Sequence, residues 1–153
     1  MTERHVETLF CDDIRQEVAG KVSFIGVYSS KLFVQSFPVV LPKLCLAVKL
    51  VSTVNDQMDR IRLQVLKDDE LVREMIVDEQ QLAAASDSAE DSQNEAESHG
   101  FQVTQFFVVF SPMRFEKPCT LRVRLQVDDD ELPGVGLTVA ELPDDQKNRD
   151  NGL

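Results

Sequence analysis

The sequence predicts an all-β protein: an antiparallel β-sandwich, with immunoglobulin-like or similar topology, interrupted by one acidic, partly helical insertion. Three observations lead to this prediction. Apolar and polar residues alternate with a period of two over most of the chain, which is typical of strands with one buried face. Turn signals separate about nine such segments at the spacing of a sandwich. One stretch, residues 79–99, instead loses its β-branched residues.

We expect one domain over residues 1–142, because 153 residues with 42% hydrophobic content suffice for a single core. Within it, residues 79–99 are expected to form a mobile acidic insertion that starts with a short helix over QQLAAAS. Residues 143–153 are polar and are expected to form a disordered tail. The insertion has no Lys or Arg, and its acidic residues are Glu79, Asp87, Glu90, Asp91, Glu95 and Glu97.

The first half of the chain contains segments with strand character that are separated by short breaks. Residues 6–13, VETLFCDD, open the fold, and KVSFIGVY and KLFVQSF follow as two further strands. VVL lies between Pro38 and Pro42, where we expect the chain to cross between sheets. KLCLAVKL then places its leucines on one face and Lys43 and Lys49 on the other.

The second half contains the clearest alternation. DRIRLQVLKD sets Ile61, Leu63 and Val65 against Arg62 and Gln64, and CTLRVRLQVDDD repeats this pattern. FQVTQFFVVFS is apolar on both faces near its end, which favours a central place in a sheet over an edge. ELVREMIVD and VGLTVAEL complete the predicted strands.

Charge and cysteine content limit the classes of partner and compartment. The net charge of −11 and the pI near 4.5 disfavour nucleic acid and anionic membranes, which require a basic surface. No apolar run approaches the ~20 residues that span a bilayer, and MTERHVETLF lacks the basic start of a signal peptide, so we expect a cytoplasmic protein. Cys11, Cys45 and Cys119 lie in apolar segments at wide spacing, which predicts buried reduced thiols.

The sequence contains no recognisable catalytic or cofactor motif. It has no GxSxG, no paired Cys or His at zinc spacing, and no Gly-rich phosphate loop. We therefore expect a non-enzymatic protein without a cofactor, and we name no catalytic residue.

CDDIRQEVAGKVSFIGVYSS, from Cys11 to Ser30, sets two carboxylates side by side ahead of a Gly-Lys turn. Adjacent strand residues point to opposite faces, so Asp12 and Asp13 are not expected to converge on one substrate. The preferred interpretation is a β-hairpin, with Gly20 supplying the permissive dihedral and Val18 continuing the apolar face. The alternative is a structural or functional role for either aspartate through backbone hydrogen bonds or a metal.

The residues from Leu9 to Leu50 carry a more specific pattern. An Asp-containing first strand leads to a Gly-Lys hairpin, an IGVY strand and an FP..LPKL connection. In this order of elements the chain resembles a family of small uncharacterised bacterial proteins. The resemblance implies an all-β domain of unassigned biochemistry, and it implies no catalytic residues.

Acidic turns at three strand ends raise the hypothesis of a calcium site. Calcium takes six to eight oxygen ligands, which loops at one rim of a sandwich can supply. The candidate ligands are Asp12, Asp128, Asp129 and Asp130, although chance acidic turns in a protein of this charge explain the same pattern.

Basic residues follow the solvent side of several predicted strands, whereas acidic residues gather in turns, the insertion and the tail. If these strands are neighbours, they form a basic sheet face that could bind an acidic partner or the chain's own acidic insertion; ordinary polar decoration of a sheet is the alternative. The candidate partner-binding residues are Lys43, Lys49, Arg60, Arg62, Arg122 and Arg124.

The function that the sequence favours is a cytoplasmic protein-interaction module that binds an unknown protein partner through a sheet face or edge, including self-association into a homo-oligomer. One alternative is an acidic mimic of nucleic acid that inhibits a basic protein. Another is a sandwich that binds calcium or a small ligand.

Overall fold

The computed structural model describes residues 3–82 and 100–147. These residues confirm the predicted all-β, sandwich-like class, since strands dominate and helices are confined to single turns. The elements are β1 (His5–Gln16), η1 (Val18–Gly20), β2 (Val22–Tyr28), β3 (Lys31–Val34), β4 (Val39–Leu41), β5 (Leu44–Thr53), β6 (Arg60–Lys67), β7 (Glu70–Asp78), β8 (Phe101–Phe110), β9 (Met113–Phe115), β10 (Cys119–Val127), β11 (Asp130–Pro133), β12 (Leu137–Glu141) and α3 (Asp144–Lys147).

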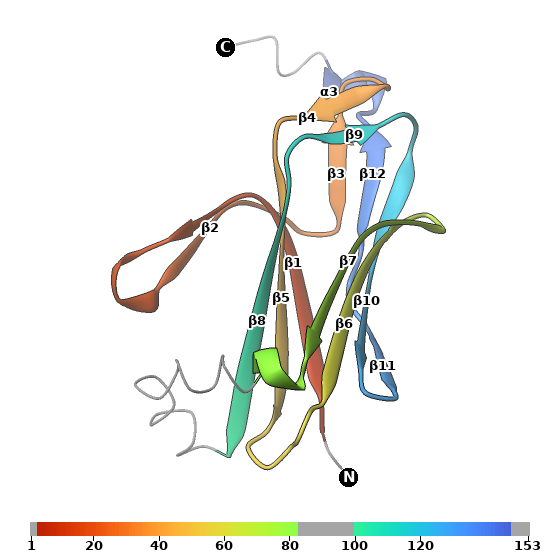
Figure 1. Ribbon diagram of the computed structural model, residues 1–153. Coiled ribbons are helices and arrows are strands. Elements are labelled where there is room, and N and C mark those ends of the chain that lie inside the picture. The colour runs from red at the N-terminus through yellow and green to blue at the C-terminus, as the bar shows by residue number, and fades with distance from the viewer. Residues whose placement is uncertain (1–2, 83–99, 148–153) are drawn as a thin grey trace. The chain divides into compact units, whose positions relative to one another are not determined.

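The strands hydrogen-bond in three groups (Figure 1). One sheet has the strand order β2-β1-β5-β8, and another has the order β3-β12-β10-β6-β7 with β11 paired to β10. β4 and β9 form a separate antiparallel pair. The pairs β1–β2, β6–β7 and β10–β12 are antiparallel as expected, whereas β3 and β12 run parallel.

The chain divides into two compact units, and each is described by itself. β1, β5, β8 and β10 contribute residues to both. The prediction of a single domain over residues 1–142 stays a prediction. Unit 1 comprises Met1–Thr8, Val48–Phe106 and Arg122–Val135, and unit 2 comprises Leu9–Ala47, Phe107–Leu121 and Gly136–Leu153.

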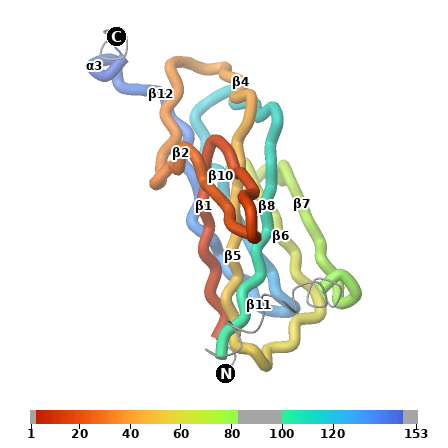
Figure 2. Tube along the Cα trace, turned by 90° about the vertical axis from the view of Figure 1, so that its left-hand side faces the viewer, coloured from red at the N-terminus to blue at the C-terminus, as the bar shows by residue number. Residues whose placement is uncertain are grey.

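Unit 1 has its core beneath β6 and β10, where the period of two places every second side chain inside. β6 and β7 form an antiparallel hairpin and run side by side in both views (Figure 1, Figure 2). The β6–β7 register shifts between Val65 and Leu66, which marks a β-bulge. The buried apolar residues of this unit are Val48, Leu50, Ile61, Leu63, Val65, Phe106, Val123, Leu125 and Val127.

Unit 2 contains the predicted β1–β2 hairpin, in which Cys11 lies opposite Val27 and Ile14 opposite Phe24. Gly20 has a φ of +72° in the turn, as the sequence predicts. The expectation for Val18 was wrong: its side chain is 85% exposed, because the chain leaves the strand for η1 at this residue. The buried side chains of unit 2 include Phe10, Leu32, Leu44, Leu46, Val108, Phe110, Phe115, Leu121, Leu137 and Val139.

The central position expected for FQVTQFFVVFS was also wrong. Among the described residues, β8 is the last strand in the order β2-β1-β5-β8. Its even-numbered residues near the end, Phe106, Val108 and Phe110, are buried, whereas Val109 is 43% exposed. An apolar run indicates that side chains on both faces of a strand are buried. It does not indicate whether a second strand is hydrogen-bonded along each backbone edge.

The insertion and the tail are only partly described. Residues 79–82 form a helical turn after β7, but residues 83–99 lie outside the described part of the chain. The tail begins with α3, and residues 148–153 likewise lie outside. Across residues 3–82 and 100–147, no helix has the length and apolar character needed to cross a membrane.

Candidate functional site

Four of the six predicted partner-binding residues lie on two neighbouring strands. Arg60 and Arg62 belong to β6, and Arg122 and Arg124 belong to β10, which lies next to β6 in the sheet. Along both strands these residues alternate with buried apolar side chains, so they occupy the face that points away from the core. We call these four residues the arginine face.

The two strands differ in how their arginines are paired. On β10, Arg122 lies 3.8 Å from Asp69, and Arg124 lies 2.9 Å from Glu131; all four side chains are largely exposed. On β6, neither Arg60 nor Arg62 lies within 4 Å of a carboxylate among the described residues. Within the arginine face, Arg60 and Arg62 are therefore the two residues without an acidic partner among the described residues.

Arg62 is half-buried, and its Nε atom has no hydrogen-bond partner among the described residues. A buried N–H group without an acceptor is costly, and more so when it carries charge. The missing hydrogen bond is therefore an energetic cost within the folded chain, because the Nε atom itself has almost no surface open to an incoming group.

Arg60 and Arg62 line a polar pocket of about 430 Å³ on unit 1. Gln126 of β10 contributes to its wall, and its side-chain amide donates to the carbonyl of Asp128 at 3.3 Å. The other lining residues are Asp59, Asp128 and Asp129. The pocket thus combines two guanidinium groups with three carboxylates.

Asp128 is already engaged by the protein itself. Its Oδ1 accepts hydrogen bonds from the backbone N–H groups of Asp59 and Arg60, at 3.0 and 2.9 Å. Its own N–H donates to the carbonyl of Arg60 at 2.9 Å. Asp128, with a φ of 53°, therefore fixes the start of β6 and positions Arg60.

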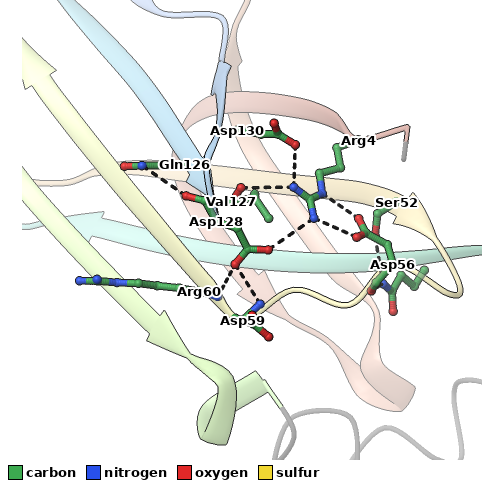
Figure 3. Close-up of polar contacts among 10 residues, drawn as sticks. Arg4, Ser52, Asp56, Asp59, Arg60, Gln126, Val127, Asp128 and Asp130 are labelled. Carbon is green, nitrogen blue, oxygen red and sulfur yellow. Dashed lines mark hydrogen bonds and ion pairs between the residues drawn. The ribbon is translucent and has the colours of Figure 1, made fainter. Parts of the chain in front are cut away.

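Arg4 lies at the centre of a polar cluster in unit 1 (Figure 3). Its Nε and Nη2 donate to the two carboxylate oxygens of Asp56 at 2.8 and 2.9 Å, a bidentate geometry. Its Nη1 donates to Asp130 at 2.8 Å and to the carbonyl of Val127 at 3.2 Å. Asp128 lies 3.5 Å from Nη2, while Arg60 points away from Arg4 (Figure 3).

Asp56, the principal partner of Arg4, is held in place by its own turn. The Asp56 N–H donates to Thr53 at 3.0 Å, and its carbonyl accepts from Gln102 at 2.9 Å. The same Gln102 amide donates to the buried Ser52 hydroxyl at 3.1 Å. The Asp56 pair and nearby carboxylates raise the pKa of Arg4. Arg4 was not singled out from the sequence, and no local pattern marks it, because its partners are remote in the chain.

The calcium hypothesis requires the candidate aspartates to converge at one rim with their carboxylates free for the ion. Asp128 and Asp130 surround Arg4, whose guanidinium supplies the positive charge among them, and Asp129 lines the pocket. Asp12 belongs to unit 2. In the part of the chain that the structure describes, no group of three or more His, Cys, Asp or Glu side chains is arranged to hold a metal ion.

Asp12 makes a specific contact within the β1–β2 hairpin. Its carboxylate accepts a hydrogen bond from the Tyr28 hydroxyl. Gly26 has a φ of +68°, and a Cβ atom there would come within 2.7 Å of the Asp12 Cγ atom. Burial and the Asp12 carboxylate raise the pKa of Tyr28. The hairpin thus accounts for Asp12 through a side-chain contact that the sequence alone did not indicate.

Asp13 points into a separate ion-pair group of unit 2. It pairs with Lys43 and, at 3.5 Å, with Arg15. The hydrogen bond from Lys43 lowers the pKa of Asp13. Lys43 therefore already has an acidic partner, and the half-buried Lys49 lies on β5, in the other sheet from the arginine face.

All three cysteines are free and buried, which confirms that part of the sequence analysis. Cys11 donates to the carbonyl of Asp13 at 3.4 Å, and Cys45 donates to the carbonyl of Asp12 at 3.8 Å. Burial, with a smaller contribution from Cys45, raises the pKa of the Cys11 thiol to about 11. Buried thiols of this kind are poor nucleophiles.

We expect iodoacetamide at pH 8 to alkylate Cys11 at least about 100-fold more slowly in the folded protein than in urea, because a rise in pKa from 9.0 to about 11 reduces the thiolate fraction by that factor.

The raised pKa of Cys11 also stabilises the folded state, and this contribution to the free energy of unfolding is complete below pH 9. This contribution to stability is lost as the pH rises through about 11, so the free energy of unfolding should fall over that range. Mass spectrometry of the labelled peptides measures the alkylation rates, and urea denaturation at each pH measures the free energy of unfolding. Equal alkylation rates in the folded protein and in urea would contradict the first of these predictions.

Comparison with known proteins identifies a family but no activity. The sequence pattern of a family of unknown function, DUF6941, matches residues 8–140. This agrees with the resemblance to an uncharacterised family that residues 9–50 suggested. A comparison with curated proteins found no match. Because the match extends over most of the chain, the protein belongs to the family of unknown function DUF6941.

Proposed function

We propose that this protein is a non-enzymatic interaction module that binds an acidic partner protein through the arginine face. The observation that carries the proposal is the pair Arg60 and Arg62, which share the outer side of β6 and have no carboxylate within 4 Å among the described residues. Arg122 and Arg124, whose ion pairs are exposed and easily exchanged, extend the same face.

Electrostatics supports an acidic partner of defined orientation. The chain has a net charge of −11, so most of its surface repels an acidic protein. The arginine face gathers four guanidinium groups, two of them without a carboxylate within 4 Å among the described residues, and this favours one docking face. Arginine is also enriched in protein interfaces, because its guanidinium binds carboxylates with two parallel hydrogen bonds.

The proposal also includes the location in the cytoplasm and the self-association that the sequence favours. A cytoplasmic location suits three unpaired cysteines, since reducing compartments keep thiols free. Self-association by edge pairing has a candidate strand in β7, which ends the order β3-β12-β10-β6-β7 among the described residues. Immunoglobulin-like topology stays a prediction. The nucleic-acid-mimic alternative rests on the net charge of −11; six of the acidic residues belong to residues 79–99, most of which lie outside the described part of the chain.

Selection of random twelve-residue peptides on the immobilised protein tests the proposal. We expect wild-type protein to enrich acidic peptides. The double variant Arg60→Glu and Arg62→Glu should bind these peptides at least about tenfold more weakly, because each arginine loses a charge-assisted hydrogen bond and gains a repulsive charge.

The matched control is the double variant Lys21→Glu and Lys117→Glu. It changes the net charge by the same amount at two exposed positions of unit 2. It should retain the wild-type affinity for the selected peptides. Equal losses in the two variants would mean that net charge alone governs binding, and retention of affinity by the Arg60/Arg62 variant would reject the arginine face.

A further inference from the structure

We infer that the protein forms a two-fold symmetric dimer in which the β8 strands of two copies pair edge to edge, antiparallel and centred on Val103. This inference rests on the self-association included in the proposed function, and it names the strand and the register. It uses the part of β8 that belongs to unit 1, residues 101–106. Among the described residues, β8 ends the order β2-β1-β5-β8 and pairs with β5 alone (Figure 1).

The backbone groups of β8 alternate between β5 and the outer edge of the sheet. The carbonyl of Gly100 accepts a hydrogen bond at 3.1 Å from the N–H of Val54, the residue that follows β5. Successive residues of a strand direct their N–H and C=O groups to opposite sides, so those of Phe101, Val103 and Gln105 point away from β5. In the part of the chain that the structure describes, no strand pairs with this side of β8. An open edge of this kind is a template for a further strand.

The other strands at the ends of the two larger sheets carry features that hinder such pairing. β7 has four charged residues among its nine, and β3 is only four residues long. β2 is interrupted at Gly26, which has a φ of +68° and is missing from the register with β1. Charges, short strands and local irregularities are the means by which proteins protect sheet edges. β8 has none of them, since its ten residues include no charged residue, glycine or proline.

The absence of charge on β8 favours a second copy of the chain as its partner. The net charge of −11 makes two copies repel each other over most of their surface. Since 28% of the residues are charged, a ten-residue strand would carry about three charges, whereas β8 has none. Two β8 strands therefore meet without like charges opposite each other. A charged segment of another protein would find no opposite charge on this strand.

The two-fold symmetry and the open backbone groups together set the register. In a symmetric dimer, if residue i of one copy lies opposite residue j, then j lies opposite i. An axis at Val103 places Val103 opposite itself and Phe101 opposite Gln105 of the second copy. In this register all three open residues of unit 1 pair with one another, which gives about six hydrogen bonds between the copies.

The same register brings exposed apolar side chains together. Phe101 is 48% exposed and Val103 is 50% exposed. Val103 meets its own copy directly, at a Cβ–Cβ distance of about 5 Å, and Phe101 is the diagonal neighbour of Val103 in the second copy, within reach of an aromatic side chain. Pairing therefore removes apolar surface from water as well as satisfying the backbone groups.

Sedimentation velocity of the full chain, from micromolar to millimolar concentration, tests the inference. We expect wild type to change from monomer to dimer over this range. Val103→Lys should raise the dissociation constant of the dimer at least about tenfold, because it sets two like charges opposite each other at the axis. The matched control is Val27→Lys on β2, where valine is 53% exposed, and it should dimerise as wild type does.

A mixture of two variants tests the register itself. Val103→Lys and Val103→Glu should each dimerise weakly alone, whereas an equimolar mixture should associate about as tightly as wild type, because opposite charges then meet at the axis. Amide hydrogen exchange of wild type, followed by NMR, gives a readout that needs no variant. The N–H groups of Phe101, Val103 and Gln105 should exchange at least about tenfold more slowly in the dimer than in the monomer.

Three results would overturn the inference: a wild type that stays monomeric, equal weakening by Val103→Lys and Val27→Lys, or a mixture that associates no better than its components. The arginine face is tested separately. A monomeric wild type that still enriches acidic peptides, and loses them in the Arg60/Arg62 charge-reversal variant, would reject the β8 dimer and leave the arginine face in place. Loss of the peptides' dependence on these arginines in a protein that still dimerises would have the opposite meaning.

Discussion

Replacement of Arg4 by methionine is expected to lower the free energy of unfolding by about 3–5 kcal/mol. The Arg4 side chain is only 9% exposed, and that of Asp56 only 4%. Methionine keeps much of the volume but leaves the Asp56 carboxylate buried without its two charge-assisted hydrogen bonds. The Val127 carbonyl and Asp130 lose their donor as well. Urea denaturation followed by circular dichroism measures the change.

Two further variants separate loss of the buried ion pair from loss of any surface arginine. Arg15→Met removes an arginine whose contact with Asp13, at 3.5 Å, is exposed, so only a small change is expected. Adding Asp56→Asn to Arg4→Met removes the unpaired charge and should recover part of the lost stability. If Arg4→Met and Arg15→Met cost the same, the cluster around Arg4 has no special role in stability.

Phe115→Ala is expected to lower the free energy of unfolding by a similar amount, about 3–5 kcal/mol, because it removes a large side chain and leaves a cavity. Phe115 is fully buried in unit 2, where β9 pairs with β4 and Phe115 lies opposite Val39. Phe33→Ala is the control, since Phe33 is 46% exposed on β3 and should cost far less. Urea denaturation of both variants, compared with wild type, measures the two effects. Equal costs for the two substitutions would show that the β4–β9 pair does not anchor a core.

The sequence predicts individual strands well, because side-chain alternation within a strand is a local property. In β6, Ile61, Leu63 and Val65 are buried as their spacing indicates. The same alternation places Arg60 and Arg62 on the outer face of β6. The residues of the candidate site on this strand can therefore be predicted from the strand's own sequence. The hairpin turn at Gly20 is predictable for a similar reason, since its residues and its dihedral requirement are adjacent in the chain.

Strand neighbours and remote ion pairs are not local, and the sequence did not reveal them. β6 and β10 are adjacent in the sheet although they lie far apart in the chain, and this adjacency creates the arginine face. Arg4 meets Asp56 and Asp130 across 52 and 126 positions, and nothing near Arg4 marks it as a buried residue. For Asp128, the acidic run suggested a metal ligand, whereas its carboxylate accepts hydrogen bonds from the backbone N–H groups of Asp59 and Arg60, where β6 begins.

The wide chain separation of the groups around Arg4 has a consequence for how the protein is made. At about 5–20 residues per second, a ribosome needs about 6–25 s to add the 126 positions that separate Arg4 from Asp130. Asp56 is added after the first 52 of these positions, and from then on Arg4 and Asp56 exist in the nascent chain without Asp128 and Asp130, which complete their cluster. Unit 1 also draws strands from three chain segments, the last of which ends at Val135. Its apolar strand faces therefore stay uncovered until late in synthesis, when chaperones are the main protection against aggregation.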